Sequence, residues 1–315
     1  MGFGGNNYAG GYGLVKYVNF SATAVLIILG ALWFSYERDK LKSIRSEVMR
    51  LAEATESMAS GNHSSQKPAM PRRELLWAAP AKWGELRLRR EDRIAHAGGA
   101  YNGETYTNSL EALDANKGEF TIFEIDLAFT SDDELVCSHD WDGYPKQIFG
   151  FDIGGVPSLS EFERLSNENP RFTNCTLTTL AKWMEENPEA VVVTDVKDRN
   201  IEALAHIAKK FPALVSRFIP QIYNMGEYDP ARALGYEKVI LTIYNWGASE
   251  IDIVEAVKGK QLFAITVPFY RAPYIGNRLK DVGHRVYAHT INSLETKNML
   301  RWFGVDEIYT DTLRD

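Results

Sequence analysis

Residues 122–126 read IFEID, and the fold of this chain depends on this stretch more than on any other. Apolar residues alternate there with Glu124 and Asp126, so in a β-strand both carboxylates point to one face. Residues 193–197 read VTDVK and repeat the arrangement with an aspartate and a lysine. Carboxylates are poor strand formers, and the apolar neighbours indicate buried strands rather than two solvated strand faces. Both stretches are therefore expected to be buried strands whose charged side chains belong to a functional site.

Short apolar runs alternate with helical patterns from residue 93 to the C-terminus. This alternation predicts a parallel sheet with helical crossovers, including helices over 177–186 and 201–211. If 135–138 is an accessory strand, the other eight runs form a (β/α)8 TIM barrel, which suits the remaining length of just over 220 residues. An open doubly wound sheet is the rival, but no GxGxxG or GxxxxGK[ST] loop follows a strand. The nine runs are 93–97, 122–128, 135–138, 191–196, 218–222, 238–243, 262–267, 285–289 and 307–309.

Acidic side chains lie near the carboxyl ends of two predicted barrel strands. Glu124 and Asp126 belong to one strand and Asp195 to the next. The inward face at this end of a barrel is where chemistry takes place. Three carboxylates there predict a site for one hard divalent cation, Mg²⁺ or Ca²⁺.

Two histidines follow predicted strands of the same region. His96 ends the first run and is followed by Ala97-Gly98-Gly99, and His139 follows the accessory strand. Imidazoles titrate near neutrality, so one can accept a proton while the other donates one. A single histidine is usually structural, but two of them around a Glu-x-Asp pair favour an acid–base role.

In this order, these residues resemble the glycerophosphodiester phosphodiesterase family. The resemblance extends from about residue 93 to the C-terminus, and its central block is the most specific part. The matching segments are His96-Ala97-Gly98, Asn108-Ser109, Phe123-Glu124-Ile125-Asp126, Thr130-Ser131-Asp132, His139-Asp140, Asp195-Val196-Lys197 and residues 304–311 (GVDEIYTD).

The resemblance implies a TIM barrel that uses a divalent metal to hydrolyse phosphodiesters of glycerol or a similar alcohol. It implies that Glu124, Asp126 and Asp195 bind the metal. His96 and His139 would be the acid and base, and Lys197 a catalytic phosphate contact. We also expect substrate contacts from Asn108, Tyr223 and His289.

The chain departs from the family pattern at four positions, which are Ala97 for the usual Arg, Thr107 for Glu, Asp195 for Glu and His289 for Trp. Ala97 removes a bidentate phosphate donor. The metal site is thus expected to be kept, while the phosphate and alcohol pockets are altered.

These departures leave alternative functions open. Asp-x-Lys at 195–197 is also found in sphingomyelinase D-like phospholipases, and the superfamily includes phosphatidylinositol-specific phospholipase C. Ala97 and Thr107 suggest a second alternative, a pseudoenzyme that binds a phosphodiester without cleaving it. A third is an interaction protein that recruits partners through its N-terminal anchor and the polar helix predicted over residues 37–59.

Residues 17–36 form an uncharged stretch that predicts a transmembrane helix. About 20 residues at a rise of 1.5 Å span the hydrocarbon core of a bilayer, and Tyr17, Trp33 and Tyr36 lie near its ends, where aromatic rings are favoured. A cleavable signal peptide or a buried helix is the alternative, but no small-residue cleavage site follows. The predicted organisation is a Gly-rich tail (1–16), the span (17–36), a helical and basic linker (37–92) and the barrel (93–315).

Charge limits the partners and indicates an orientation. The formal net charge of −7 argues against an extended nucleic-acid surface. Lys16 alone precedes the span, whereas Arg38, Lys40, Lys42, Arg45 and Arg50 follow it, so the positive-inside rule predicts a cytoplasmic barrel. Cys137 and Cys175 form no CxxC pair and indicate neither a zinc ribbon nor a disulfide framework.

Overall fold

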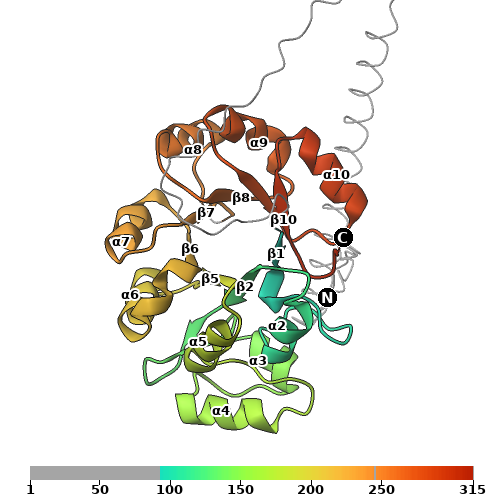
Figure 1. The fold of residues 1–315 in the computed structure, drawn as a ribbon, viewed down its shortest axis with the longest axis vertical. Helices are drawn as coiled ribbons and strands as arrows, with labels where there is room; N and C mark the ends of the chain where they lie inside the picture. The colour runs from blue at the N-terminus through green and yellow to red at the C-terminus, as the bar shows by residue number, and fades with distance from the viewer. Residues whose placement is uncertain (1–92, 245, 315) are drawn as a thin grey trace, which may run out of the picture. The chain divides into compact units, whose positions relative to one another are not determined.

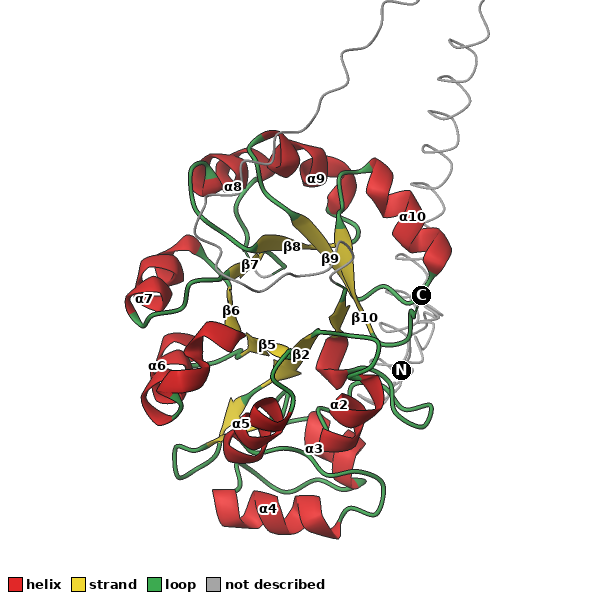
Figure 2. Cartoon of the chain, in the orientation of Figure 1, coloured by secondary structure: helices red, strands yellow, loops and turns green. Residues whose placement is uncertain are grey.

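A closed barrel of eight parallel strands forms the centre of the computed structural model, which describes residues 93–244 and 246–314. The predicted tail, membrane span and linker lie outside the described residues. Figures 1 and 2 show the strands as a ring with helices around it. The strands are β1 (Ile94–Ala95), β2 (Ile122–Asp126), β5 (Val191–Asp195), β6 (Phe218–Ile222), β7 (Ile240–Thr242), β8 (Ala264–Pro268), β9 (Val286–His289) and β10 (Glu307–Thr310).

The barrel closes where β1 pairs with β10 on one side and with β2 on the other. The prediction of a TIM barrel is confirmed. The run at 135–138 is also accessory, as expected, because β4 (Leu135–Val136) pairs antiparallel with β3 (Ala128–Phe129) and not with a barrel strand.

The helices start at side-chain caps in several places. The α5 helix (Leu177–Glu186) begins after Thr176, whose hydroxyl accepts from the Thr179 amide while Thr179 caps in return. Both helices predicted from spacing are present, the second as α6 (Asn200–Lys210). The others are α2 (Leu110–Asn116), α3 (Tyr144–Phe149), α4 (Leu159–Glu168), α7 (Tyr228–Ala233), α8 (Glu250–Val257), α9 (Ala272–Asp281) and α10 (Leu294–Trp302), with 3-10 turns η1 (His96–Gly98), η2 (Pro212–Arg217) and η3 (Met225–Glu227).

Two apolar layers position the strands. One fills the barrel interior and includes Ile122, Val193 and Tyr309, and the other packs the outer faces of the strands against the helices. Because Ile122 points inward, Glu124 and Asp126 point inward as well, further along the same strand. This register places both carboxylates at the carboxyl end of the barrel.

A disulfide joins Cys137 and Cys175. The sequence indicated no disulfide framework, and this expectation is corrected. The backbone brings the two segments together, since the Cys137 amide donates to the Cys175 carbonyl at 2.7 Å and Val136 bridges to Thr176. The bond therefore ties the segment that leads to His139 to the start of α5.

Among the described residues, no helix has the length and apolar character that crossing a membrane requires.

Candidate active site

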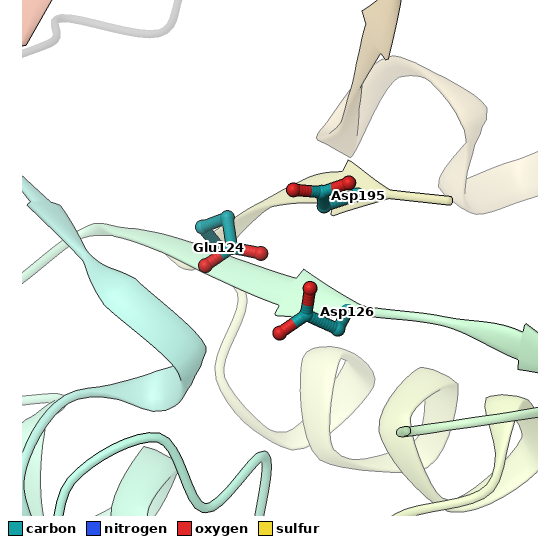
Figure 3. Close-up of side chains that lie close together, drawn as sticks. All are labelled: Glu124, Asp126 and Asp195. Carbon is teal, nitrogen blue, oxygen red and sulfur yellow. The ribbon is translucent and has the colours of Figure 1, made fainter. Parts of the chain in front are cut away.

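Three buried carboxylates lie together at the ends of β2 and β5 (Figure 3). The pairing of these strands sets Asp126 beside Asp195 and Glu124 beside Val193. One ligand oxygen from each of Glu124, Asp126 and Asp195 lies within 4.8 Å of the others. Glu124 and Asp126 are each only 2% exposed, so the negative charge of the cluster is largely removed from water.

Lys197 partly neutralises this cluster. Its ammonium Nζ donates to Asp126 Oδ1 and to Asp195 Oδ1, each at 2.8 Å. Burial opposes the charge of Lys197, but these two carboxylates outweigh burial and raise the pKa of the ammonium. In turn, burial alone would raise the pKa of Asp126, and the positive charge of Lys197 lowers it. The structure thus places Lys197 among the three carboxylates. Its contact with a substrate phosphate stays a prediction.

Of the three carboxylates, Glu124 has the fewest partners for its negative charge. Its Oε2 accepts from the Ala97 amide at 2.8 Å, while the buried Oε1 has no hydrogen-bond partner among the described residues. Burial and the neighbouring charge of Asp126 raise the pKa of Glu124. A divalent cation fits this donor set, because clustered carboxylate oxygens with an unsatisfied buried atom are what a hard cation coordinates. The identity of the metal, Mg²⁺ or Ca²⁺, stays a prediction.

His96 lies beside Glu124 and is oriented by Asp311. Its Nδ1 is 2.8 Å from Asp311 Oδ1, and its Nε2 is 3.9 Å from Glu124 Oε2. A carboxylate only accepts, so Nδ1 carries the proton of this hydrogen bond. Burial would lower the pKa of His96, but the hydrogen bond to Asp311 and the charges of Glu124 and Asp311 raise it to about 9.

Sequence reasoning gave Asp311 no role, although it belongs to a matching segment. It follows β10, and β10 pairs with the strand before His96. Asn292 Nδ2 donates to Asp311 Oδ2 at 2.6 Å, and the Asp311 amide donates to Asn292 Oδ1 at 2.8 Å. Its position directly after the last barrel strand could have marked Asp311 as a site residue in the sequence.

His139 has a similar arrangement, with Asp140 as its carboxylate partner. Its Nδ1 is 2.6 Å from Asp140 Oδ2, and the other oxygen of Asp140 accepts from the amides of residues 142–144. Burial would raise the pKa of Asp140, but its hydrogen bonds with His139 and these amides lower it to about 2. Each histidine thus has its Nδ1 on a carboxylate, and its role in proton transfer stays a prediction.

The aromatic ring of Tyr106 contacts both histidines, a feature that the sequence did not predict. It stacks on His96 with centroids 4.9 Å apart and an interplanar angle of 24°, and it lies 5.2 Å from His139 at 52°. Burial and the charges of Asp126 and Glu124 raise the pKa of Tyr106, so its hydroxyl stays neutral. No periodicity or motif in the sequence marked this loop position.

The three predicted substrate contacts lie around the cluster, and substrate binding by them stays a prediction. Asn108 Nδ2 donates to Asp126 Oδ2 and its Oδ1 accepts from the Asp126 amide, both at 3.0 Å. The Tyr223 hydroxyl donates to Asp195. His289 lies 5.4 Å from the ring of Tyr244, its buried Nε2 has no partner among the described residues, and burial lowers its pKa to about 4.

The two departures near His96 have clear structural consequences. Ala97 adopts a left-handed backbone conformation with φ +47°, which turns its amide toward Glu124. Thr107 is buried, and its hydroxyl lies 2.9 Å from that of Ser109 rather than in the carboxylate cluster. Neither residue supplies a charge to the site.

Comparison with solved structures finds the same fold in glycerophosphodiester phosphodiesterases. One from Thermotoga maritima is 23% identical, with 70% of this chain and 94% of that chain covered and a TM-score of 0.54. One from Parabacteroides distasonis is 20% identical, with 70% and 93% covered and a TM-score of 0.54. A phosphodiesterase from Oleispira antarctica, in complex with the product sn-glycerol-3-phosphate, is 18% identical, with 70% and 92% covered and a TM-score of 0.53.

The resemblance indicated by the sequence is confirmed at the level of the fold. No protein-family model and no curated protein sequence matches the chain. The chain is therefore similar in fold to glycerophosphodiester phosphodiesterases.

Proposed function

We propose that this protein is a metal-dependent phosphodiesterase that hydrolyses glycerophosphodiester-like substrates. One observation carries the proposal, namely the cluster of Glu124, Asp126 and Asp195 with His96 beside it at the carboxyl end of the barrel. Three buried carboxylates with oxygens within 4.8 Å of one another destabilise the fold through mutual repulsion and desolvation, so packing of the barrel alone does not account for them. Buried carboxylates whose pKa values are perturbed by desolvation and by neighbouring charges are typical of catalytic sites.

The protein side chains have separate tasks in this proposal. A divalent cation bound by the three carboxylates would supply positive charge to a non-bridging phosphoryl oxygen. Lys197 adds a second positive charge at the same place and holds Asp126 and Asp195 in position. One of the two histidines takes the proton of the nucleophile at its Nε2, and the other gives a proton to the leaving alkoxide.

The nucleophile is either water or a neighbouring hydroxyl of the substrate. Asp311 and Asp140 accept hydrogen bonds from the Nδ1 atoms of His96 and His139. In this tautomer Nδ1 carries a proton, and Nε2 is the nitrogen that exchanges a proton with the substrate. Water as nucleophile gives a phosphomonoester and an alcohol, whereas an internal hydroxyl gives a cyclic phosphate. Product analysis by ³¹P NMR distinguishes them.

The substrate class rests on the fold likeness and on the altered pockets. The Oleispira antarctica protein was solved with sn-glycerol-3-phosphate, which supports a glycerol-containing diester here, either phospholipid-derived or part of a polymer. Because Ala97 offers no side-chain phosphate donor, lipids of the sphingomyelinase D type are the second candidate, supported by Asp195-Val196-Lys197.

A direct test measures hydrolysis of an aryl phosphodiester with and without a chelator, followed by a panel of glycerophosphodiesters, lysolipids and polymer phosphodiesters. Chelator-sensitive turnover supports the proposal, and the best substrate in the panel defines the class. Binding of a diester without any turnover would favour the pseudoenzyme alternative instead.

The membrane anchor is proposed from the sequence of residues 17–36. Burial of this apolar stretch in lipid, at about 25 cal/mol per Å², is worth many kcal/mol, while the barrel buries its own core. We expect a protein that starts near Arg72 to leave the membrane fraction and to keep its activity on small soluble diesters. Activity on membrane lipids should fall because the enzyme is no longer held at the surface.

Fractionation of cells that express the full chain or the shortened chain checks this prediction. A full-length protein that stays in the supernatant after removal of membranes would contradict the anchor. Orientation is tested separately by adding protease to intact cells or spheroplasts. The charge pattern predicts a protected, cytoplasmic barrel, and digestion of the barrel would reverse that orientation while leaving the anchor in place.

A further inference from the structure

The loop between η1 and α2 places Tyr106 against both histidines of the site. Tyr106 has a backbone φ of +63°, and three other non-glycine residues nearby, Ala97, Asn102 and Asn108, also have positive φ values. Left-handed backbone is unfavourable for side chains other than glycine, and it persists only where the surroundings hold it. Four such residues between positions 97 and 108 indicate that the surrounding structure holds this segment in one conformation.

Hydrogen bonds fasten the chain immediately after Tyr106. The Thr107 carbonyl accepts from the Tyr144 hydroxyl and from Asn174 Nδ2, each at 2.8 Å. The Asn108 amide donates to the Ala97 carbonyl at 3.1 Å. The ring of Tyr106 is therefore carried by a backbone that is anchored to the site, and its edge also meets Tyr144 with centroids 5.9 Å apart.

Among residues 93–244 and 246–314, each of the two histidines makes its side-chain hydrogen bond through Nδ1 alone. A bond from Nδ1 to Asp311 or Asp140 sets the tautomer and holds one edge of each ring, while tilting of the ring plane is limited by the groups that pack on its faces. His96 follows β1, and His139 follows β4, so they belong to different parts of the fold. The Tyr106 ring lies against both imidazoles.

We propose that Tyr106 is a positioning residue that fixes the planes of His96 and His139 and keeps their Nε2 atoms aimed at the same phosphodiester. This inference rests on the proposed function and assigns a role to a residue that the sequence did not mark. Misplacement of a catalytic group by about 1 Å costs about 10²-fold in rate, so restraint of this kind has a measurable value.

The test compares Tyr106→Phe, Tyr106→Leu and Tyr106→Ala in the full-length protein, with Tyr274→Ala as control because Tyr274 is 59% exposed on α9. The contacts are made by the ring, so we expect Tyr106→Phe to keep kcat within about twofold. The Ala and Leu variants should lose about 10- to 100-fold in kcat with little change in KM. Tyr274→Ala should leave both constants unchanged.

A second measurement does not depend on turnover. In ¹H–¹³C relaxation measurements on labelled histidines, the imidazole signals of both His96 and His139 should show added exchange broadening in the Ala and Leu variants, and not in Tyr106→Phe or Tyr274→Ala. A change in chemical shift alone is expected from the lost ring current of Tyr106 and does not count as support. Normal kcat per folded molecule with a lowered Tm would overturn the proposal, as would unchanged histidine line widths in the Ala and Leu variants or an equal loss in Tyr106→Phe. If the wild-type protein hydrolyses no diester, the proposed function fails, while these spectra still decide whether Tyr106 positions the rings.

Discussion

Replacing Glu124 with Gln is expected to abolish most metal-dependent turnover, with a loss of about 10²- to 10³-fold. The neutral amide keeps the size of the side chain but removes one of three charges that would bind the cation, and a metal's electrostatic contribution to catalysis is several kcal/mol. Metal affinity should fall together with kcat. Calorimetric titration with Mg²⁺ and Ca²⁺, together with steady-state kinetics, measures both quantities.

The matched control for this change is Glu163→Gln, an exposed glutamate on α4 outside the site. It should bind metal and turn over substrate like the wild type. Divalent cations should also raise the Tm of the wild-type protein, because binding relieves the repulsion among Glu124, Asp126 and Asp195. Wild-type activity that persists unchanged after thorough chelation would disprove the metal site.

Replacing His96 or His139 with Ala should lower kcat by about 10²- to 10⁴-fold while the protein remains folded. Each change removes a group that is proposed to give or take a proton at the phosphodiester. Both side chains are partly exposed, at 19% for His96 and 27% for His139, so their loss leaves no closed cavity in the core. Steady-state kinetics combined with thermal unfolding separates catalysis from stability.

His206→Ala is the control, since His206 lies on α6, 3.5 Å from Glu134 and away from the carboxylate cluster. It should change kcat little. A His96 or His139 variant with a lowered Tm but normal kcat in its folded fraction would show that the histidine is structural.

The barrel could be predicted because its strands are short apolar runs with local turn and helix signals between them. Glu124 and Asp126 were recognisable since both lie in one strand, where a spacing of two fixes a common face. Asp195 could be added because its strand has the same alternation. The pairing of β2 with β5 then places the three carboxylates together without any further long-range information.

The rest of the site depends on contacts between distant parts of the chain. The contact between His96 and Asp311 requires closure of the barrel between its first and last strands, which no local pattern specifies. Tyr106 lies in a loop, where side-chain direction follows from left-handed backbone and tertiary hydrogen bonds rather than from a period. The Cys137–Cys175 pair is separated by 38 residues and has no spacing motif.

That disulfide bears on the cellular compartment in which the barrel folds. Disulfides persist in oxidising compartments and are rare in the reducing cytosol. In the chain-entropy account, a bond that closes a loop of 38 residues stabilises the folded state by about 4 kcal/mol. The bond therefore favours an extracytoplasmic barrel and opposes the orientation that the positive charges after residue 36 predict. Alkylation of cell-derived protein before and after reduction reads out the pair directly. Together with the proposed anchor, the oxidation state of Cys137 and Cys175 would report the side of the membrane on which the barrel folds.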